Sequence, residues 1–396
     1  MRADSDIVFR DPTEPGSSLI PREDWDRAPW NRWSFQNLRE IVPTARVWRG
    51  EGPVCPLPAS PRDIDDVAFE IDGHRDTIGR HIETSFADGF LVLHRGMVVA
   101  ERYLNGMTDR TLHLSQSVSK SIVGTVAGIL AERGELDVEA LVTRYLPELE
   151  DTAYRGATVQ HVLDMTSGVA FDETYSALDS HMAKLDVACG WKGGGDPSWP
   201  KTVWELILTL KEAECVHGTS FRYRSIETDV LAFILQRISG IALADLVARE
   251  LWAPMGAQED ACFTVDPSGY ALASGGFNAT LRDYGRFALL HLGGGEINGR
   301  RIVPAGWIDN TRRGGGGPFA GVYREVLPHG AYHNQFWIED PRRQTYMARG
   351  VFGQMIYLDP GAEFAAVVLS SWPEFLNVTR SRTTLAALHA IRDALA

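Results

Sequence analysis

The stretch from Leu114 to Ile122 constrains this chain most, because it joins a short polar motif to the start of an apolar helix. The motif is Ser117-Val118-Ser119-Lys120, an S-x-x-K tetrad. Apolar side chains follow it at helical spacing, at Val118, Ile122, Val126, Ile129 and Leu130. Gly134 ends this pattern. Since residues three apart share one face of a helix, Ser117 and Lys120 are expected to point the same way.

A serine and a lysine on one helical face can act together as nucleophile and base. A serine hydroxyl is a weak nucleophile until a base takes its proton. A lysine can be that base when burial or a neighbouring cation disfavours its ammonium form, and the apolar face offers burial. The alternative is that the tetrad arises by chance and that Ser117 only caps the helix. Partners further along the chain decide between the two interpretations.

The composition is typical of a globular protein and argues against several classes of function. The chain has 396 residues, 44% of them hydrophobic and 23% charged, which is enough for two domains. A net charge of −13 argues against a surface that binds nucleic acid or anionic membranes. No apolar run is long enough to span a bilayer, and the N-terminus lacks the apolar core of a signal peptide. We therefore expect a cytoplasmic protein without nucleic-acid or membrane partners.

The sequence contains no motif for a metal or a cofactor. Its four cysteines are scattered and form no C-x-x-C pair, so neither a zinc site nor a disulfide framework is expected: Cys55, Cys189, Cys215 and Cys262. The glycine-rich nucleotide-binding motifs, H-E-x-x-H and G-x-S-x-G are also missing. We therefore expect neither a metal nor a cofactor.

Hydrophobic patterns place strands towards both ends of the chain and helices between them. Residues 90–94 and 98–103 flank Arg95-Gly96, which predicts a strand pair with a tight turn. A polar, glycine-rich stretch over 171–201 is expected to be a long loop. The other expected elements are helices over 203–210, 229–238, 243–251 and within 275–292, strands over 335–338, 345–347, 355–358 and 364–369, and a closing helix over 383–395.

This order predicts an α/β fold, with an antiparallel sheet flanked by helices and interrupted by an inserted, mainly helical domain. Residues 1–110 and 290–396 would form the α/β domain and residues 111–289 the helical one. The active site is expected in the cleft between them.

Two further segments are candidate partners of the tetrad. Tyr223 lies between two helical stretches and could relay protons if its pKa falls beside a cationic Lys120. The alternative is a half-buried tyrosine on a loop. Gly350 opens a strand, where it would permit a close backbone approach and leave an N–H free to face a ligand oxygen. The alternative there is a strand edge or a bulge.

Taken together, these segments resemble the serine β-lactamase-like hydrolases, which include class C β-lactamases, DD-peptidases and related esterases. The 6-aminohexanoate-dimer hydrolases (nylon-oligomer hydrolases) are the most similar group, and the resemblance covers nearly the whole chain. It implies a β-lactamase/transpeptidase-like fold. The segments that carry it are Asn31–Phe35, Ser117–Ser121, Asp164–Gly168, Tyr223–Ser225, Thr228–Ala232, the Gly350 strand and Ser370–Pro373.

The resemblance assigns a role to each catalytic position. Ser117 would attack the acyl carbonyl, Lys120 would take its proton, and Tyr223 would pass a proton to the leaving group. The backbone N–H groups of Ser117 and Val351 would form the oxyanion hole. The second donor stays open, because Gly353-Gln354 offers another register.

Two departures from the family pattern bear on the substrate. Ala348-Arg349-Gly350 stands where β-lactamases and DD-peptidases usually carry Lys or His before Thr/Ser-Gly. Tyr223-Arg224-Ser225 stands in place of the usual Tyr-x-Asn. The missing lysine would hold a substrate carboxylate, so its absence weakens the β-lactam interpretation and fits an amidase or esterase.

The resemblance also implies a substrate pocket. Asp186 matches an acidic residue that faces the amino end of the substrate, and Tyr175 matches a tyrosine near the leaving group. Trp337 is expected to close the pocket from the strand side, and Ser225 and Gly350 to line it. The alternative for Asp186 is a solvated loop carboxylate.

The sequence therefore predicts a serine hydrolase that cleaves small linear amides or esters through an acyl-enzyme, similar to a 6-aminohexanoate-dimer hydrolase. A β-lactamase or DD-peptidase-type enzyme, and a non-catalytic binding protein on the same fold, are the alternatives. The expected partner is a small-molecule substrate. The natural substrate stays open, and so does the oligomeric state, with a homodimer as one option.

Overall fold

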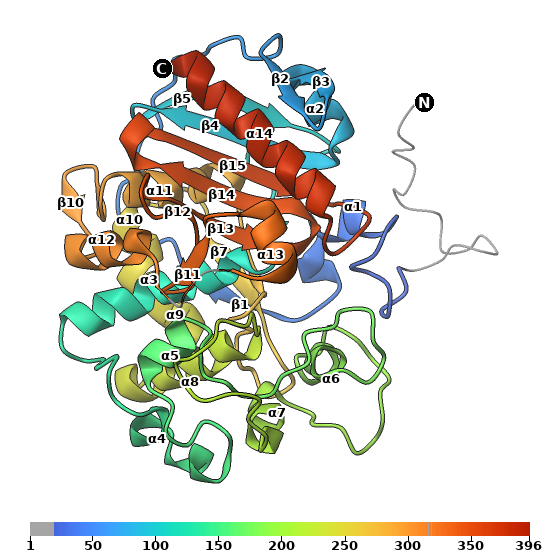
Figure 1. The fold of residues 1–396 in the computed structure, drawn as a ribbon, viewed down its shortest axis with the longest axis vertical. Helices are drawn as coiled ribbons and strands as arrows, with labels where there is room; N and C mark the ends of the chain where they lie inside the picture. The colour runs from blue at the N-terminus through green and yellow to red at the C-terminus, as the bar shows by residue number, and fades with distance from the viewer. Residues whose placement is uncertain (1–19, 316, 318) are drawn as a thin grey trace.

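The computed structural model describes residues 20–315, 317 and 319–396. Its main feature is a seven-stranded antiparallel sheet in the order β11-β12-β13-β14-β15-β4-β5 (Figure 1). The strands are β4 (Ala87–His94), β5 (Met97–Tyr103), β11 (Ala331–His333), β12 (Phe336–Asp340), β13 (Thr345–Gly350), β14 (Gln354–Asp359) and β15 (Phe364–Ser370). Strands from early and late parts of the chain thus pair directly, β4 with β15.

Both faces of this sheet are buried, because successive strand side chains point to opposite faces and both sets are apolar. On β15, Val367 belongs to the larger hydrophobic cluster and Val368 to the second one. Leu388 of helix α14 (Val378–Leu395) joins the second cluster, and Figure 1 shows this helix running across the sheet. Leu290 of helix α11 (Leu281–Leu292) joins the larger cluster on the opposite face. The sheet is therefore the middle layer of three.

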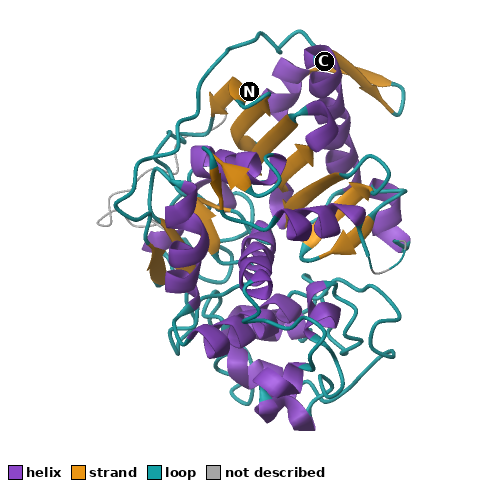
Figure 2. Cartoon of the chain, turned by 90° about the vertical axis from the view of Figure 1, so that its left-hand side faces the viewer, coloured by secondary structure: helices purple, strands orange, loops and turns teal. Residues whose placement is uncertain are grey.

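Most of the remaining helices gather at the other end of the molecule, away from the sheet (Figure 2). They are α4 (Val142–Tyr145), α5 (Val159–Leu163), α6 (His181–Ala188), α7 (Val203–Thr209), α8 (Ile226–Ser239) and α9 (Leu243–Val247). The short helix α10 (Ala253–Met255) lies beside α11 instead (Figure 1). Helix α3 (Val118–Glu132) lies between this group and the sheet, and contacts both α8 and β13. Every residue from Val118 to Leu130 is buried, as expected for a helix that is packed on all sides.

A second, four-stranded sheet lies beside the N-terminal end of α3, in the order β1-β7-β8-β6. Its strands are β1 (Thr44–Val47), β6 (His113–Leu114), β7 (Ala261–Thr264) and β8 (Phe277–Ala279). β6 leads into the S-x-x-K segment, so this sheet fixes where the motif begins. The other elements are peripheral: α1 (Asn31–Ser34), β2 (Ala68–Ile71), β3 (His74–Thr77), α2 (Ile78–Thr84), β9 (Glu296–Ile297), β10 (Arg300–Arg301), α12 (Ala305–Arg313) and α13 (Gly321–Val326).

The predicted hairpin at Arg95-Gly96 is confirmed. β4 and β5 pair antiparallel, and Arg95 and Gly96 have φ values of 51° and 75°. Two residues with positive φ form the type of turn whose twist matches that of the strands. The predicted C-terminal strands and closing helix are also confirmed, with shifts at their ends.

Two sequence predictions differ from the structure. The predicted loop over 171–201 contains helix α6, which Ser180 caps by accepting a hydrogen bond from the amide of Ala183. The predicted domain boundary at 289/290 falls inside α11, which packs on β15, β14 and β4. The first 19 residues of the predicted α/β domain lie outside the described residues. The division into two domains otherwise stays a prediction.

Across the described ranges, we find no single helix that is long and apolar enough to cross a membrane. The bent pair Ile226–Ser239 and Leu243–Met255 meets the length and composition criteria together, with an angle of 77° between its helices.

Candidate active site

Ser117 lies at the junction between β6 and α3. Gln116 has a φ of 51°, in the left-handed region, and turns the chain between the strand and the helix. Ser117 is the N-cap residue of α3, yet its side chain makes no capping hydrogen bond. Its hydroxyl is therefore available to other partners, which argues against the interpretation of Ser117 as a plain helix cap.

Lys120 lies directly beneath this hydroxyl and is 1% exposed. Its Nζ is 3.0 Å from Oγ of Ser117, 3.1 Å from Oγ of Ser225 and 2.5 Å from the carbonyl oxygen of Ser274. Burial lowers the pKa of Lys120 from 10.5 to about 8, against the opposing charges of Glu173 and Asp229. The predicted pair is therefore within hydrogen-bond distance, and its lysine deprotonates readily.

Tyr223 completes the group, since its ring lies 5.2 Å from Nζ of Lys120 and its hydroxyl interacts with Ser117. Its pKa does not fall as the sequence suggested. Burial raises the pKa of Tyr223 well above 10, although the hydrogen bond with Ser117 acts in the opposite direction. Tyr223 is therefore a neutral phenol, which can pass a proton on but does not start as a phenolate.

Trp337 packs on Tyr223, and its role in closing the substrate pocket stays a prediction. It is 6% exposed, and its ring stacks on the ring of Tyr223 at 5.2 Å. Arg349 lies over the Trp337 ring at 5.5 Å and donates a hydrogen bond to Ser381. Trp337 therefore supports the ring of Tyr223, and the Arg349 guanidinium is held against Trp337.

Gly350 brings the end of β13 against the backbone of the nucleophile segment. A Cβ atom at this position would lie 2.5 Å from the carbonyl oxygen of Ser115 and 3.0 Å from the amide nitrogen of Ser117. Only glycine permits this approach. The next residue, Val351, lines the same cavity as Ser117. Within the described chain, the amides of Ser117 and Val351 donate to no backbone carbonyl, so both N–H groups are available.

A residue that the sequence analysis missed joins this site. Glu173 accepts hydrogen bonds from Oγ and from the amide of Ser225, at 2.6 and 2.9 Å. It also accepts one from the hydroxyl of Tyr175 at 2.9 Å, and the Tyr175 ring stacks on Phe375. Glu173 lies 52 residues before Ser225 in an irregular segment, so no periodicity pointed to it.

Asp186 lies on helix α6, and it lines the cavity that contains Ser117. Burial raises the pKa of Asp186 from 3.8 to about 7, and the charge of Asp26 acts in the same direction. Lys192, which is paired with Asp26 at 2.6 Å, lowers it. Asp186 as a whole is half-buried, and its carboxylate makes no hydrogen bond with the described residues, so it can accept one from a ligand.

The cavity at this site is narrow, about 20 Å³, which is room for one water molecule. Its lining contains five predicted site residues, Ser117, Tyr175, Asp186, Ser225 and Val351. A larger cavity of about 400 Å³ lies elsewhere, lined mainly by charged side chains that include Arg39, Arg46, Arg49, Arg110, Glu259 and Asp260. It contains none of the predicted residues, so volume alone does not mark the active site.

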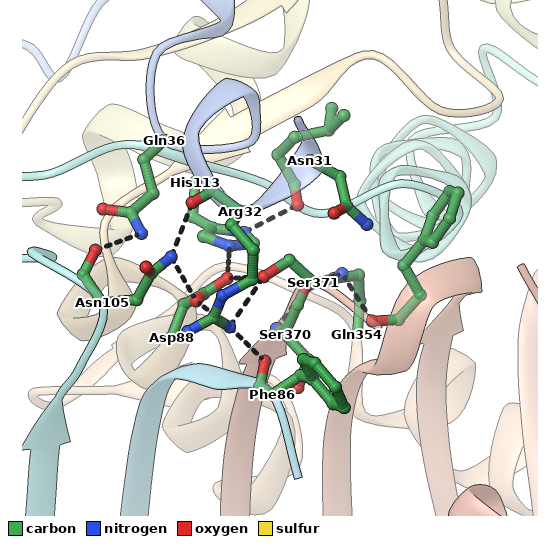
Figure 3. A network of polar contacts seen from close by, with 12 residues as sticks. Asn31, Arg32, Gln36, Phe86, Asp88, Asn105, His113, Gln354, Ser370 and Ser371 are labelled. Atoms are coloured by element: carbon green, nitrogen blue, oxygen red, sulfur yellow. Dashed lines mark hydrogen bonds and ion pairs between the residues drawn. The ribbon is translucent and has the colours of Figure 1, made fainter. Parts of the chain in front are cut away.

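A buried polar network fixes strand β6, which leads to Ser117 (Figure 3). Asp88 is fully buried and accepts hydrogen bonds from His113 at 3.0 Å and Ser371 at 2.7 Å. It also accepts bonds from Arg32 at 2.8 Å and Asn105 at 2.9 Å. These residues come from five separate segments of the chain, so one carboxylate joins the N-terminal region to both sheets. This network therefore helps to hold β6, and with it Ser117, in position.

Comparison with known proteins agrees with this site. A family model described as Beta-lactamase matches residues 81–391. The 6-aminohexanoate-dimer hydrolase of Paenarthrobacter ureafaciens is 35% identical over 359 residues, which cover 89% of this chain and 88% of that protein. The solved structure of a Bacillus anthracis protein, provisionally named 6-aminohexanoate-dimer hydrolase, has a TM-score of 0.86 and 27% identity. It covers 97% of this chain and 99% of its own. Esterase EstB of Burkholderia gladioli is 29% identical over 191 residues, 46% of this chain and 47% of that protein.

These matches confirm the predicted resemblance, the β-lactamase/transpeptidase-like fold class and the hydrolase function. The family model spans most of the chain, and the first relative covers nearly all of it. The protein therefore belongs to the beta-lactamase family of serine hydrolases.

Proposed function

We propose that this hydrolase cleaves small linear amides or esters on Ser117 and prefers substrates with a free amino group on the acyl side. The observation that carries the proposal is the 3.0 Å contact between Nζ of Lys120 and Oγ of Ser117. With a pKa of about 8, Lys120 is neutral in about one molecule in ten at pH 7, and in most molecules above pH 8. A neutral lysine at this distance can take the serine proton.

In the proposed reaction, the proton of Ser117 moves to Nζ of Lys120 while Oγ attacks the acyl carbonyl carbon. The tetrahedral intermediate collapses when its bond to the leaving nitrogen or oxygen breaks. Tyr223 gives its phenol proton to that leaving group and takes back the proton that Lys120 received from Ser117, because its neutral phenol lies against both Ser117 and Lys120. Water then hydrolyses the acyl-enzyme with the same groups in reverse roles.

The developing oxyanion would be held by the N–H groups of Ser117 and Val351. The close packing of Gly350 on the Ser115–Ser117 backbone supports this register, since it brings Val351 into the same cavity. Gly353 is the weaker alternative, because it packs against the Trp372 ring. Each donor in such a site is worth about 3 kcal/mol of transition-state stabilisation.

The proposed preference for an amino group rests on Asp186 and on the missing strand lysine. Asp186 offers an unpaired carboxylate in the cavity that contains Ser117. Arg349 does not replace the lysine as a carboxylate anchor, because it is held against Trp337 and Ser381. A relative named for the dimer of an amino acid, 6-aminohexanoate, fits this arrangement, because such a linear dimer carries a free amino group. Since the cavity is water-sized, a linear substrate must displace the side chains that line it, Tyr175 among them.

The test combines labelling with a substrate panel. A serine-reactive phosphonate should label Ser117 alone, and Ser117→Ala should abolish turnover without changing the circular dichroism spectrum. Among short amides and esters, those with a terminal amine should have a higher kcat/KM than those without one, and nitrocefin should react slowly. Labelling at another serine would overturn the mechanism, and fast nitrocefin turnover would favour the β-lactamase alternative.

Three expected properties of this protein stay predictions. They are the cytoplasmic location, the absence of nucleic-acid and membrane partners, and the homodimer as one option for the oligomeric state.

A further inference from the structure

Lys120 can act as a base only when its lone pair faces Ser117, and its three contacts decide where that lone pair points. An ammonium group donates to all three nearby oxygens, those of Ser117, Ser225 and Ser274. The neutral amine has only two N–H bonds and one lone pair. One of the three oxygens must therefore donate a hydrogen bond to Nζ instead of accepting one.

The directions of two of these hydrogen bonds, those to Ser274 and Ser225, follow from which groups can donate and which can only accept. The carbonyl oxygen of Ser274 only accepts, so it takes one N–H of Lys120. The hydroxyl of Ser225 could either donate to Nζ or accept from it. Its Oγ lies 2.6 Å from Oε1 of Glu173, and a carboxylate oxygen only accepts, so the hydroxyl proton of Ser225 goes to Glu173. Ser225 therefore accepts the second N–H, and the lone pair is left for the hydroxyl of Ser117.

Glu173 is itself held in place by three donors. Its Oε2 accepts from the amide of Ser225 at 2.9 Å, and its Oε1 accepts from Tyr175 at 2.9 Å as well as from the Ser225 hydroxyl. Both carboxylate oxygens are thus engaged, so the group is held in the orientation that takes the Ser225 proton. The usual asparagine at position 225 could reach Lys120 directly, whereas the shorter serine hydroxyl has two possible directions and needs a neighbour to fix one.

We propose that Glu173 is a positioning residue of this active site, which acts through Ser225 to aim the lone pair of Lys120 at the hydroxyl of Ser117. This inference rests on the proposed function and adds a residue to it. Glu173 touches no reacting atom. Its effect is to fix the direction of the hydrogen-bond chain Lys120–Ser225–Glu173.

The substitution Glu173→Gln tests this directly, because the side chain keeps its shape but gains an N–H₂ donor. Its amide can donate to Ser225, which frees the Ser225 hydroxyl to occupy the lone pair of Lys120. We expect the single-turnover acylation of Ser117 by p-nitrophenyl acetate to fall about tenfold or more, with KM within about twofold of wild type. Glu173 and Asp229 are the two carboxylates whose charges raise the pKa of Lys120. Without the charge of Glu173 this pKa should fall, so the acidic limb of the pH–rate profile should also move to lower pH. A general loosening of the site would not move the limb in that direction.

Ser225→Ala and the double variant show whether Glu173 acts through Ser225. The acylation rate of Ser225→Ala should fall by a similar factor. The rate of the double variant should be little lower than that of either single variant, because both substitutions break the same hydrogen-bond chain. Asp179→Asn is the matched control, since it removes an exposed carboxylate of the same segment and should leave the rate unchanged. Additive losses, or Ser225→Ala at the wild-type rate, would overturn the proposal, even if Glu173→Gln did not fold.

The failure of this inference can be told apart from failure of the proposed function. If the phosphonate labels a serine other than Ser117 in the wild-type enzyme, the proposed function itself is wrong. If Ser117 is labelled but Glu173→Gln keeps the wild-type rate and pH limb, only the role of Glu173 is wrong.

Discussion

At the scale of single residues, the buried lysine should set the pH dependence of turnover on a neutral ester. Lys120 must be neutral to take the serine proton, and burial lowers its pKa to about 8. We therefore expect kcat/KM to rise about tenfold per pH unit below pH 8 and to level off above it. The profile of a p-nitrophenyl ester between pH 6 and 10 checks this. A plateau that extends down to pH 6 would contradict the assignment.

Lys120→Arg separates the charge of this residue from its basicity. Arginine keeps the positive charge but does not deprotonate in a protein, so it cannot take the proton of Ser117. We expect kcat to fall by about 10² to 10⁴, the usual contribution of a general base. A variant that retains half of its activity on the same ester would show that Lys120 acts only through its charge.

Asp186 should add a second titration, visible only with substrates that carry an amino group. With a raised pKa of about 7, the carboxyl group is ionised above this pH and binds an ammonium group there. For an amino-bearing amide, the slope of log kcat/KM against pH should therefore approach two below pH 7, while a neutral ester keeps a slope of one. Asp186→Asn should remove the extra slope and lower kcat/KM at pH 8 about 10- to 100-fold for the amide alone. Equal effects on both substrates would make Asp186 a structural residue.

Distance along the chain explains which residues of the site could be predicted. Ser117 and Lys120 are three apart on one helix, so periodicity alone placed them together. Tyr223 and Val351 were placed by their resemblance to a known motif order. Glu173 has neither signal, because its contact with Ser225, at the start of α8, is formed by an irregular segment. The role of Trp337 stays a prediction, because strand alternation gives the face of the sheet on which it lies but not which neighbour covers it.

At the scale of elements, helix α6 shows why a long polar stretch was mistaken for a loop. Its residues His181 to Ala188 mix charged and apolar side chains, and only Leu185 and Ala188 are buried. The hydrophobic pattern is therefore too weak to predict a helix, although Ser180 is a good capping residue. The two-residue strand β6 is equally hard to predict, since its existence depends on pairing with β8, more than 160 residues away.

The carboxylate that fixes β6 should be one of the most costly to replace. Asp88→Asn removes a fully buried carboxylate and leaves the Arg32 guanidinium, which is 26% exposed, without its counter-charge. We expect a loss of about 3 kcal/mol in the free energy of unfolding, measured in urea. Asp72→Asn is the matched control, because Asp72 pairs with Arg382 at the same 2.8 Å but is about half exposed. That variant should lose less than about 1 kcal/mol, and equal losses would show that Asp88 is not a central connection.

At the scale of the whole molecule, the order of strands and helices along the chain predicted the architecture but not the domain boundary at 289/290. Apolar strands near both ends with helices between them fit a few layered folds, and the motif order selected one of them. The boundary failed at α11 because a helix that covers a sheet has the same pattern as one that covers other helices. β1 and β7 pair across more than 200 residues of chain, which no local pattern reveals.

Buried ionisable groups make the stability of the molecule depend on pH with opposing signs. Burial raises the pKa of Glu227 to about 7 and of Asp229 to about 6, so both cost stability as the pH rises towards those values. Burial lowers the pKa of His81 to about 4 and of His291 to about 3, so these residues cost stability as the pH falls towards 4. Since the two sets oppose each other, the wild-type profile cannot isolate one group, and a difference between two variants is needed.

Asp186→Asn provides that difference and links stability to function. The folded protein keeps a proton on Asp186 up to a pKa of about 7, whereas the unfolded chain releases it near pH 4. The contribution of Asp186 to wild-type stability therefore falls as the pH rises from 4 to 7 and is constant above that. Asparagine removes this dependence. The free energy of unfolding of the variant, relative to that of wild type, should therefore rise by about 1 kcal/mol between pH 5 and pH 8, after allowance for the partial exposure of Asp186. Thermal melts at pH 5, 6, 7 and 8 should show a Tm difference that grows by about 2 °C over this range. A difference that is the same at pH 5 and pH 8 would mean that Asp186 is ionised throughout, and would remove the reason to assign it a second titration in catalysis.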